Sequence, residues 1–339
     1  MSIKNWNAGI IRPVAVAPAG PYQDGAAPGV WTLDQQAFWQ KQGLWPIAGN
    51  LAPRGLFGGG RNAGINTNVI DYITITTVGN AIDFGDLTLG RYLLGACSSS
   101  TRGVFGPGLG PSYTNVIDYV TFSSIGNAAD FGDFTFLTSE LAGCSSSTRG
   151  IFGGGTVGGA VGNVISYITI STLGNTTDFG DLTVSRDRLS ACSSPTRGIF
   201  AGGETPSVVN IIDYITISST GNATDFGDLT VSRGELAGCS SSTRGLFGGG
   251  YNTSFVDTNI IDYITIATTG NAIDFGDLTV ARSGVGACSS STRGVFAGGS
   301  PSNVIDYVTI SSIGNAIDFG DLTVGREAPA GCSNGHGGL

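Results

Sequence analysis

The stretch RGIFAGGETPSVVNIIDYITISSTGNATDFGDLTVSRGELAGC, residues 197–239, decides the fold because close copies of it fill most of the chain. Six copies are visible, with a period of 44 to 49 residues. In every copy, 15 residues separate the Asn of Asn-(Val/Ile)-Ile-(Asp/Ser)-Tyr from the first Asp of Asp-Phe-Gly-Asp, and a cysteine follows 14 residues later. The step from Arg-Gly-(Leu/Val/Ile)-Phe to that Asn varies from 10 to 15 residues, so every insertion or deletion falls in one loop.

Each copy reads as four short strands. In the first copies these are residues 94–98 around the cysteine, 102–105, 69–75 and 81–88. They are rich in Val, Ile, Tyr, Phe and Thr, which fit a pleated sheet, and Gly, Asn and Ser clusters separate them. Four strands per unit of this length, repeated six times, indicate a β-propeller.

Counting strands predicts how the ring closes. The first copy lacks a cysteine strand, whereas the chain ends with an additional one, residues 328–334. Placing this strand beside Arg54 completes six four-stranded blades and removes open sheet edges. We therefore predict an all-β fold, a six-bladed propeller over residues 51–339 that a C-terminal strand closes.

Composition excludes several classes of function. The 339 residues carry a net charge of −9, and the only lysines are Lys4 and Lys41, which argues against nucleic acid as a partner. No apolar run approaches the length of a membrane span, and the N-terminal sequence lacks the pattern of a signal peptide. With His336 as the single histidine, we expect no enzymatic activity, no catalytic residues, no cofactor and no metal.

Repeated residue types receive structural interpretations. The triplet Asp-Phe-Gly binds magnesium in protein kinases, but the other kinase motifs are missing. We expect its Phe to pack between blades and its aspartates to accept hydrogen bonds from turns or arginines. Aspartates of the third strand should pair with arginines within or between blades. The six cysteines are expected to be reduced and buried.

Sequence variation is concentrated on one face. In an up-and-down blade, the second-to-third and fourth-to-first connections lie on the same side. Both connections vary among the copies, and a rigid frame with variable loops is typical of a binding surface, although loops also drift where nothing constrains them. The candidate binding residues are Arg61, Asn62, Tyr92, Tyr113, Glu140, Arg188, Glu204, Glu235, Tyr251, Phe255 and Asp257.

Residues 1–50 form a different kind of segment. They contain all four tryptophans, and Thr32 with Gln35 predicts a capping box for one short helix over residues 33–42. We expect this segment to anchor the chain on another protein, and the alternative is that it packs under the propeller. The candidate anchor residues are Trp6, Trp31, Trp39 and Trp45.

The repeats resemble kelch repeats. The resemblance rests on the Gly-Gly pair after the second strand, the Tyr of the third strand, such as Tyr72, and the Arg after the fourth, although no repeat contains the Trp of kelch units. Near-identical repeats behind a Trp-rich leader are also similar to virion structural proteins of tailed bacteriophages, particularly marine ones. This second resemblance implies a tail fibre, tail tip or appendage in several copies per particle, made in the host cytoplasm.

On that resemblance, residues 1–50 would bind other virion proteins, and the variable face would recognise a host-surface glycan or protein. Two alternatives remain open. One is decoration of the capsid or tail without receptor binding. The other is a glycan-processing enzyme, which predicts a convergent cluster of carboxylates and Tyr on the axis.

Overall fold

The computed structural model describes residues 5–6, 9–10, 52–300 and 302–339. The chain divides into two units, residues 1–53 and residues 54–339. In the first unit, β1 (Asn5–Trp6) pairs antiparallel with β2 (Gly9–Ile10). The predicted helix over residues 33–42, Trp31, Trp39, Trp45 and the side chain of Trp6 lie outside the described residues. The described residues include no helix able to cross a lipid bilayer.

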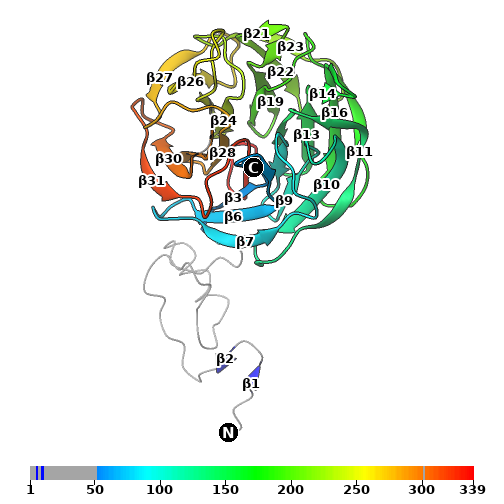
Figure 1. Cartoon of the computed structure of the whole chain (residues 1–339), viewed down its shortest axis with the longest axis vertical. Coiled ribbons are helices and arrows are strands. Elements are labelled where there is room, and N and C mark those ends of the chain that lie inside the picture. The colour runs from blue at the N-terminus through cyan, green and yellow to red at the C-terminus, as the bar shows by residue number, and fades with distance from the viewer. Residues whose placement is uncertain (1–4, 7–8, 11–51, 301) are drawn as a thin grey trace, which may run out of the picture. The chain divides into compact units, whose positions relative to one another are not determined.

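The second unit is a six-bladed β-propeller, which confirms the predicted fold (Figure 1). Every blade is an antiparallel sheet of four main strands. The innermost strands are β32 (Ala330–Ser333), β8 (Ala96–Ser98), β12 (Ala142–Ser145), β18 (Ser190–Ser193), β24 (Ala237–Ser240) and β28 (Gly286–Ser289). The second strands are β3 (Arg54–Gly58), β9 (Arg102–Phe105), β13 (Arg149–Gly153), β19 (Arg197–Ala201), β25 (Arg244–Gly248) and β29 (Arg293–Ala297), and blades 1 to 6 are numbered in this order.

The two outer strands complete each blade. The third strands are β6 (Val69–Thr74), β10 (Thr114–Thr121), β16 (Val164–Thr169), β22 (Ile211–Thr216), β26 (Ile260–Thr265) and β30 (Val304–Thr309). The outermost strands are β7 (Ile82–Asp86), β11 (Ala129–Ser139), β17 (Thr177–Asp181), β23 (Thr224–Asp228), β27 (Ile273–Asp277) and β31 (Ile317–Asp321). Short hairpins in the second-to-third connections add β4 (Arg61–Asn62), β5 (Ile65–Asn66), β14 (Thr156–Val157), β15 (Ala160–Val161), β20 (Glu204–Thr205) and β21 (Ser207–Val208).

The C-terminal strand closes the ring as predicted. Strand β32 pairs antiparallel with β3, with Leu56 opposite Cys332 and Phe57 opposite Gly331. Next to this pair, the Arg54 N–H donates to Asn334 Oδ1 at 2.7 Å. Blade 1 is therefore built from both ends of the propeller sequence.

The hydrophobic core is divided into six clusters, and each lies between two adjacent blades. As expected, the Phe of every Asp-Phe-Gly triplet is buried in one of them. Phe84, for example, meets the edge of Tyr72 at 6.0 Å between ring centroids. The Arg54 guanidinium lies over the Tyr72 ring, and its Nη1 donates to the Phe122 carbonyl of the next blade. The same arrangement recurs in all six blades, so the frame residues hold neighbouring blades together.

Buried ion pairs also join the blades. Five third-strand aspartates each form an ion pair with the arginine that follows the outer strand of the preceding blade, which confirms the expected pairing and places it between blades. The pairs are Arg91–Asp118, Arg186–Asp213, Arg233–Asp262, Arg282–Asp306 and Arg326–Asp71, at 2.7 to 3.1 Å. All ten side chains are at most 1% exposed.

The junction of blades 2 and 3 lacks such a pair because both partners are replaced. Thr138 stands where the arginine recurs, and Ser166 stands where the aspartate recurs. Phe134 packs edge-on against Phe152 at this junction, with 5.9 Å between ring centroids. Strand β11 is also longer than the other outer strands and pairs with β14 from the variable loop of blade 3. At this junction an apolar contact and additional strand pairing thus replace the buried ion pair that joins the blades at the other five junctions.

The aspartates of Asp-Phe-Gly-Asp behave differently from our expectation. Asp83 is exposed, Asp86 is half-buried, and no described residue forms an ion pair or a side-chain hydrogen bond with either carboxylate. The glycine between them, Gly85, has φ of +144° at a β-bulge, and a Cβ there would lie 2.5 Å from Gly126 of the next blade. Close approach of two blades, and not carboxylate chemistry, explains the motif.

Small residues line the channel along the axis. The residue before each cysteine is alternately Ala and Gly around the ring, in the order Ala96, Gly143, Ala191, Gly238, Ala287 and Gly331. A Cβ at Gly238 would lie 2.5 Å from the Ala191 carbonyl oxygen, so only alternate strands have room for a side chain. The cysteines are buried as predicted and face the next blade, where Cys192 Sγ occupies the space that a Cβ on Gly245 would need.

Candidate functional site: the channel mouth on the variable face

One end of the channel is surrounded by the residues four positions before the cysteines. These residues, which we call the mouth ring, are Leu93, Glu140, Arg188, Glu235, Gly284 and Ala328. Each backbone N–H donates to the carbonyl of the equivalent residue in the preceding blade, at 2.7 to 3.3 Å. The Leu93 N–H donates to the Ala328 carbonyl and closes the circle.

The mouth ring has an unusual backbone conformation. All six residues have φ between 50° and 63°, the left-handed region, which costs a residue with a side chain about 1 kcal/mol. The same conformation occurs with Leu, Glu, Arg, Gly and Ala, so the hydrogen-bonded ring requires it whatever the side chain. The side chains of the mouth ring are therefore free to differ.

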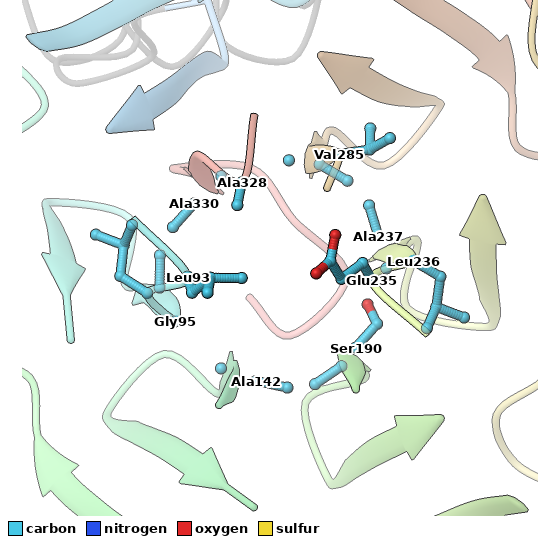
Figure 2. A pocket seen from close by; sticks show the side chains of 18 of the residues that line it. Leu93, Gly95, Ala142, Ser190, Glu235, Leu236, Ala237, Val285, Ala328 and Ala330 are labelled. Atoms are coloured by element: carbon cyan, nitrogen blue, oxygen red, sulfur yellow. The ribbon is translucent and has the colours of Figure 1, made fainter. Parts of the chain in front are cut away.

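A cavity of about 110 Å³ lies within the mouth ring, and inner strands of all six blades line it. Its two halves differ in chemistry. Gly284, Ala328 and Leu93, on consecutive blades, are uncharged, whereas Glu140, Arg188 and Glu235 form the charged half. Figure 2 shows the Glu235 carboxylate turned into the cavity and Leu93 on the opposite side.

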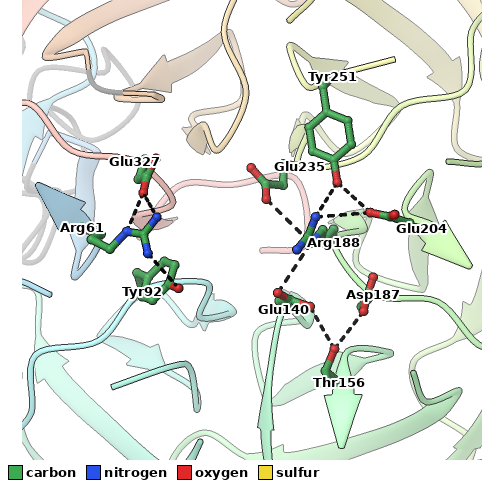
Figure 3. A network of polar contacts seen from close by, with 10 residues as sticks. All are labelled: Arg61, Tyr92, Glu140, Thr156, Asp187, Arg188, Glu204, Glu235, Tyr251 and Glu327. Carbon is green, nitrogen blue, oxygen red and sulfur yellow. Dashed lines mark hydrogen bonds and ion pairs between the residues drawn. The ribbon is translucent and has the colours of Figure 1, made fainter. Parts of the chain in front are cut away.

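Arg188 is the centre of a network of carboxylates (Figure 3). Its Nε lies 3.5 Å from Glu140 Oε1 and 3.8 Å from Glu235 Oε1, and its Nη1 lies 3.3 Å from Glu204 Oε2. Nη1 also donates to the Tyr251 hydroxyl, which donates in turn to Glu204. These ion pairs are longer than those between the blades, and three carboxylates share one guanidinium. The network therefore has an excess of negative charge.

A second contact extends the network to Asp187. Thr156 Oγ1 lies 2.9 Å from Glu140 Oε2 and 2.8 Å from Asp187 Oδ2. The Thr156 hydroxyl has one proton and can donate it to only one of these two carboxylates at a time. Burial raises the pKa of Asp187 to about 6, and the negative charge of Glu140 raises this pKa further.

Glu235 is the least satisfied of these carboxylates. Burial raises its pKa to about 7, against the opposing effect of Arg188, while Glu140, Glu327 and Asp257 raise it further. Among the described residues, its one ion pair is the 3.8 Å contact with Arg188, and none of them donates a hydrogen bond to its carboxylate. A desolvated carboxylate with free acceptor positions can bind a proton or a ligand donor.

A smaller cluster lies on the same face at blades 1 and 2. Arg61 Nε donates to Glu327 Oε1 at 2.6 Å, and the guanidinium lies over the Tyr92 ring, 4.5 Å from its centroid. Arg61 Nη1 also donates to the Tyr92 hydroxyl. These contacts join second-to-third and fourth-to-first connections, so the two kinds of variable loop do meet on one face.

The remaining candidates surround these clusters. Phe255 is 69% exposed and stacks on Tyr251, with ring centroids 5.5 Å apart, and Asp257 forms a β-bridge with Tyr251. Asn62 is exposed in β4, and Tyr113 is half-buried beside Leu109. The structure thus brings together Glu140, Arg188, Glu204, Glu235 and Tyr251 in one network and Arg61 with Tyr92 in another.

Sequence reasoning did not place Thr156, Ser190 or Glu327 among the candidate binding residues. Glu327, like Asp187, directly precedes a mouth-ring residue, and this position varies among the copies as the chosen ones do. Its alignment beside the mouth ring was a signal available in the sequence.

The opposite end of the channel is uniform and closed. Six serines follow the cysteines, and each hydroxyl donates to the carbonyl of the preceding serine at 2.6 to 2.8 Å, from Ser98 round to Ser333. His336 enters this ring, and its Nε2 donates to the Ser98 carbonyl while Nδ1 accepts from the Gly338 N–H. Burial lowers the pKa of His336 to about 4.

Within the described residues, no three His, Cys, Asp or Glu side chains are grouped so as to hold a metal ion. Neither protein-family models nor curated proteins match this chain. Its function is therefore inferred from the geometry of the variable face.

Proposed function

We propose that this protein is a non-enzymatic binding protein of a virus particle, on which the propeller recognises a host-surface glycan or protein. The observation that carries the proposal is the difference between the two ends of the channel. The variable face gathers the unequal loops and the Arg188 network around an open cavity. The other end has the same serine in every blade and contains the chain's own tail.

The frame suits such a role because it is rigid independently of the loops. Buried Arg–Asp pairs, the mouth ring and the serine ring all link adjacent blades. Loop side chains on a rigid frame lose little conformational entropy on binding, which favours affinity.

Placement on a virion is supported by the resemblance of the near-identical repeats and the Trp-rich leader to structural proteins of tailed bacteriophages. In this proposal, residues 1–50 attach the chain to other virion proteins in a tail fibre, tail tip or appendage. Several copies on one particle would strengthen a weak single contact through avidity.

Electron microscopy of particles from the producing system, labelled with an antibody against residues 51–339, tests this placement. Label at the tail tip or fibres supports host recognition, and label over the capsid favours decoration instead. Absence of label on intact particles contradicts a virion role. Recognition itself is tested by exchanging the loop of residues 251–257 for that of blade 6 and measuring adsorption, which should fall.

The second candidate is a glycan-processing enzyme. It is favoured by the convergence of Glu140, Glu204, Glu235 and Tyr251 around Arg188, with Glu140 and Glu235 at the channel mouth, since such an activity predicts a cluster of carboxylates and Tyr. Arg188 lies among these carboxylates and pairs with three of them. Release of reducing ends from a capsular or cell-wall polysaccharide by the purified chain, and its loss in Glu235→Gln, would favour this candidate over the first.

A further inference from the structure

We propose that the cavity within the mouth ring binds the charged amino group of an amino sugar, with the sugar ring against Leu93 and Ala328. This rests on the proposed function, since it names the ligand that the variable face recognises. Three features carry it: a carboxylate without a hydrogen-bond donor, a hydroxyl without a partner that faces the cavity, and an apolar wall opposite them.

The carboxylate is that of Glu235. It points into the cavity, has no hydrogen-bond donor among the described residues, and is 3.8 Å from the nearest guanidinium nitrogen (Figure 2). Glu140 and Glu204 add further negative charge around Arg188. A ligand ammonium would supply both the missing donors and the missing positive charge.

The hydroxyl is that of Ser190. The residue is only 6% exposed, lines the cavity, and forms no side-chain hydrogen bond with any described residue. Figure 2 shows its oxygen directed toward Glu235. The five equivalent positions carry Gly95, Ala142, Ala237, Gly286 and Ala330, so this hydroxyl is not part of the repeated frame. A hydroxyl that faces the cavity without a partner among the described residues can donate to a ligand or accept from it.

The opposite wall lacks charge. Leu93 lies opposite Glu235 in the mouth ring, because Leu93 belongs to blade 2 and Glu235 to blade 5 of the six blades. The small residues Ala328 and Gly284 leave space open between them on one side of the cavity. Carbohydrate rings combine C–H surfaces with hydroxyl groups, so one side can contact Leu93 while the other donates to Ser190 and Glu235. A lysine ammonium has three donors and could also reach both Glu235 and Ser190. A sugar ring fills the space between these groups and Leu93 more completely than a single methylene chain, which is why we favour a sugar.

The test uses the purified full-length chain and isothermal titration with glucosamine. We expect saturable binding with Kd on the order of 1 mM, the usual range for one small ligand with few contacts. N-acetylglucosamine, which lacks the positive charge, should bind at least about tenfold more weakly, because it loses a charge-assisted hydrogen bond to Glu235. Titration with N-α-acetyl-lysine amide tests the alternative that the bound ammonium belongs to a lysine side chain of a peptide.

The matched variants come from the repeats themselves. Glu235→Ala reproduces the residue of blade 1 in the mouth ring, and Ser190→Ala reproduces Ala142, so neither introduces a residue foreign to its position. Glu235→Ala should weaken glucosamine binding at least about tenfold and Ser190→Ala about threefold or more. Asp83→Asn, on the exposed outer strand, is the control and should leave binding unchanged.

No saturable glucosamine binding, equal binding of glucosamine and N-acetylglucosamine, or unchanged binding in Glu235→Ala overturns the assignment. Equal or tighter binding of N-α-acetyl-lysine amide overturns it in favour of a peptide ligand. Adsorption is measured separately on particles, so absence of sugar binding together with loop-dependent adsorption rejects the amino sugar and leaves host recognition standing.

Discussion

Replacing Arg233 by Thr should destabilise the propeller strongly. Arg233 and Asp262 are both fully buried, and Nη2 lies 2.7 Å from Oδ2. Without the guanidinium, the Asp262 carboxylate keeps only the Thr230 backbone N–H at 3.3 Å and the Thr230 hydroxyl at 2.6 Å. Removing one partner of a buried ion pair typically costs about 3–5 kcal/mol, so we expect a loss of that size in the free energy of unfolding.

The junction of blades 2 and 3 supplies the second half of the experiment, because Thr138 and Ser166 occupy both positions there. The double variant Arg233→Thr/Asp262→Ser copies this junction and contains no unpaired buried charge. It should be less destabilised than the sum of the two single variants, by about 2–3 kcal/mol. Some loss should remain, since Leu229 stands where Phe134 fills the space in blade 2.

Equilibrium unfolding in urea, followed by far-ultraviolet circular dichroism, measures the four free energies of this cycle. The denaturant slopes must agree among the variants for the comparison to hold. Asp83→Asn is the control and should change stability by less than about 0.5 kcal/mol. Additivity of the single variants within about 0.5 kcal/mol would refute the reasoning, since it would mean that the buried charges do not depend on each other.

Four further results are expected. Gly238→Ala should destabilise by about 1–3 kcal/mol in urea unfolding, because its Cβ meets the Ala191 carbonyl, whereas Ala191→Gly should cost less. Glu235 has its pKa raised from 4.5 to about 7, so the folded state binds more protons and its stability should fall as pH rises through this range; Glu235→Gln should remove that slope in unfolding measured at several pH values. His336 has its pKa lowered from 6.5 to about 4, so stability should be lost as pH falls from 6.5 toward 4, and the ring protons of His336 should titrate near pH 4 by NMR. The six cysteines should react with a thiol reagent only after unfolding, since burial raises the pKa of every thiol; fast reaction of the native chain would contradict their burial.

The sequence predicted the parts of the fold that every copy repeats. Strand order, closure by the C-terminal strand, burial of Phe84 and its equivalents, and pairing of the third-strand aspartates all follow from residue types at fixed spacing. Six copies make such an inference reliable, because a position that keeps its residue in every blade has the same neighbours in every blade.

The features that sequence reasoning missed depend on pairs of blades. Thr138 and Ser166 are each visible as irregularities in the sequence, but their relation appears only when blade 2 lies against blade 3. The alternation of Ala and Gly before the cysteines likewise arises from crowding between neighbouring strands at the axis. The Arg188 network joins two loops of blade 4 with loops of blades 3 and 5, and no local pattern encodes such a meeting.

The way blade 1 closes also determines when the propeller can complete its folding during synthesis. Strand β3 leaves the ribosome before any other strand of the propeller, yet its inner neighbour β32 is the last to be made, and Arg54 and Asn334 are 280 residues apart. Until β32 has been made, the nascent propeller is an open arc whose first and last blades expose apolar surface. Circularity is thus acquired in one late step, and a chain truncated before residue 330 should be prone to aggregate because that step never occurs.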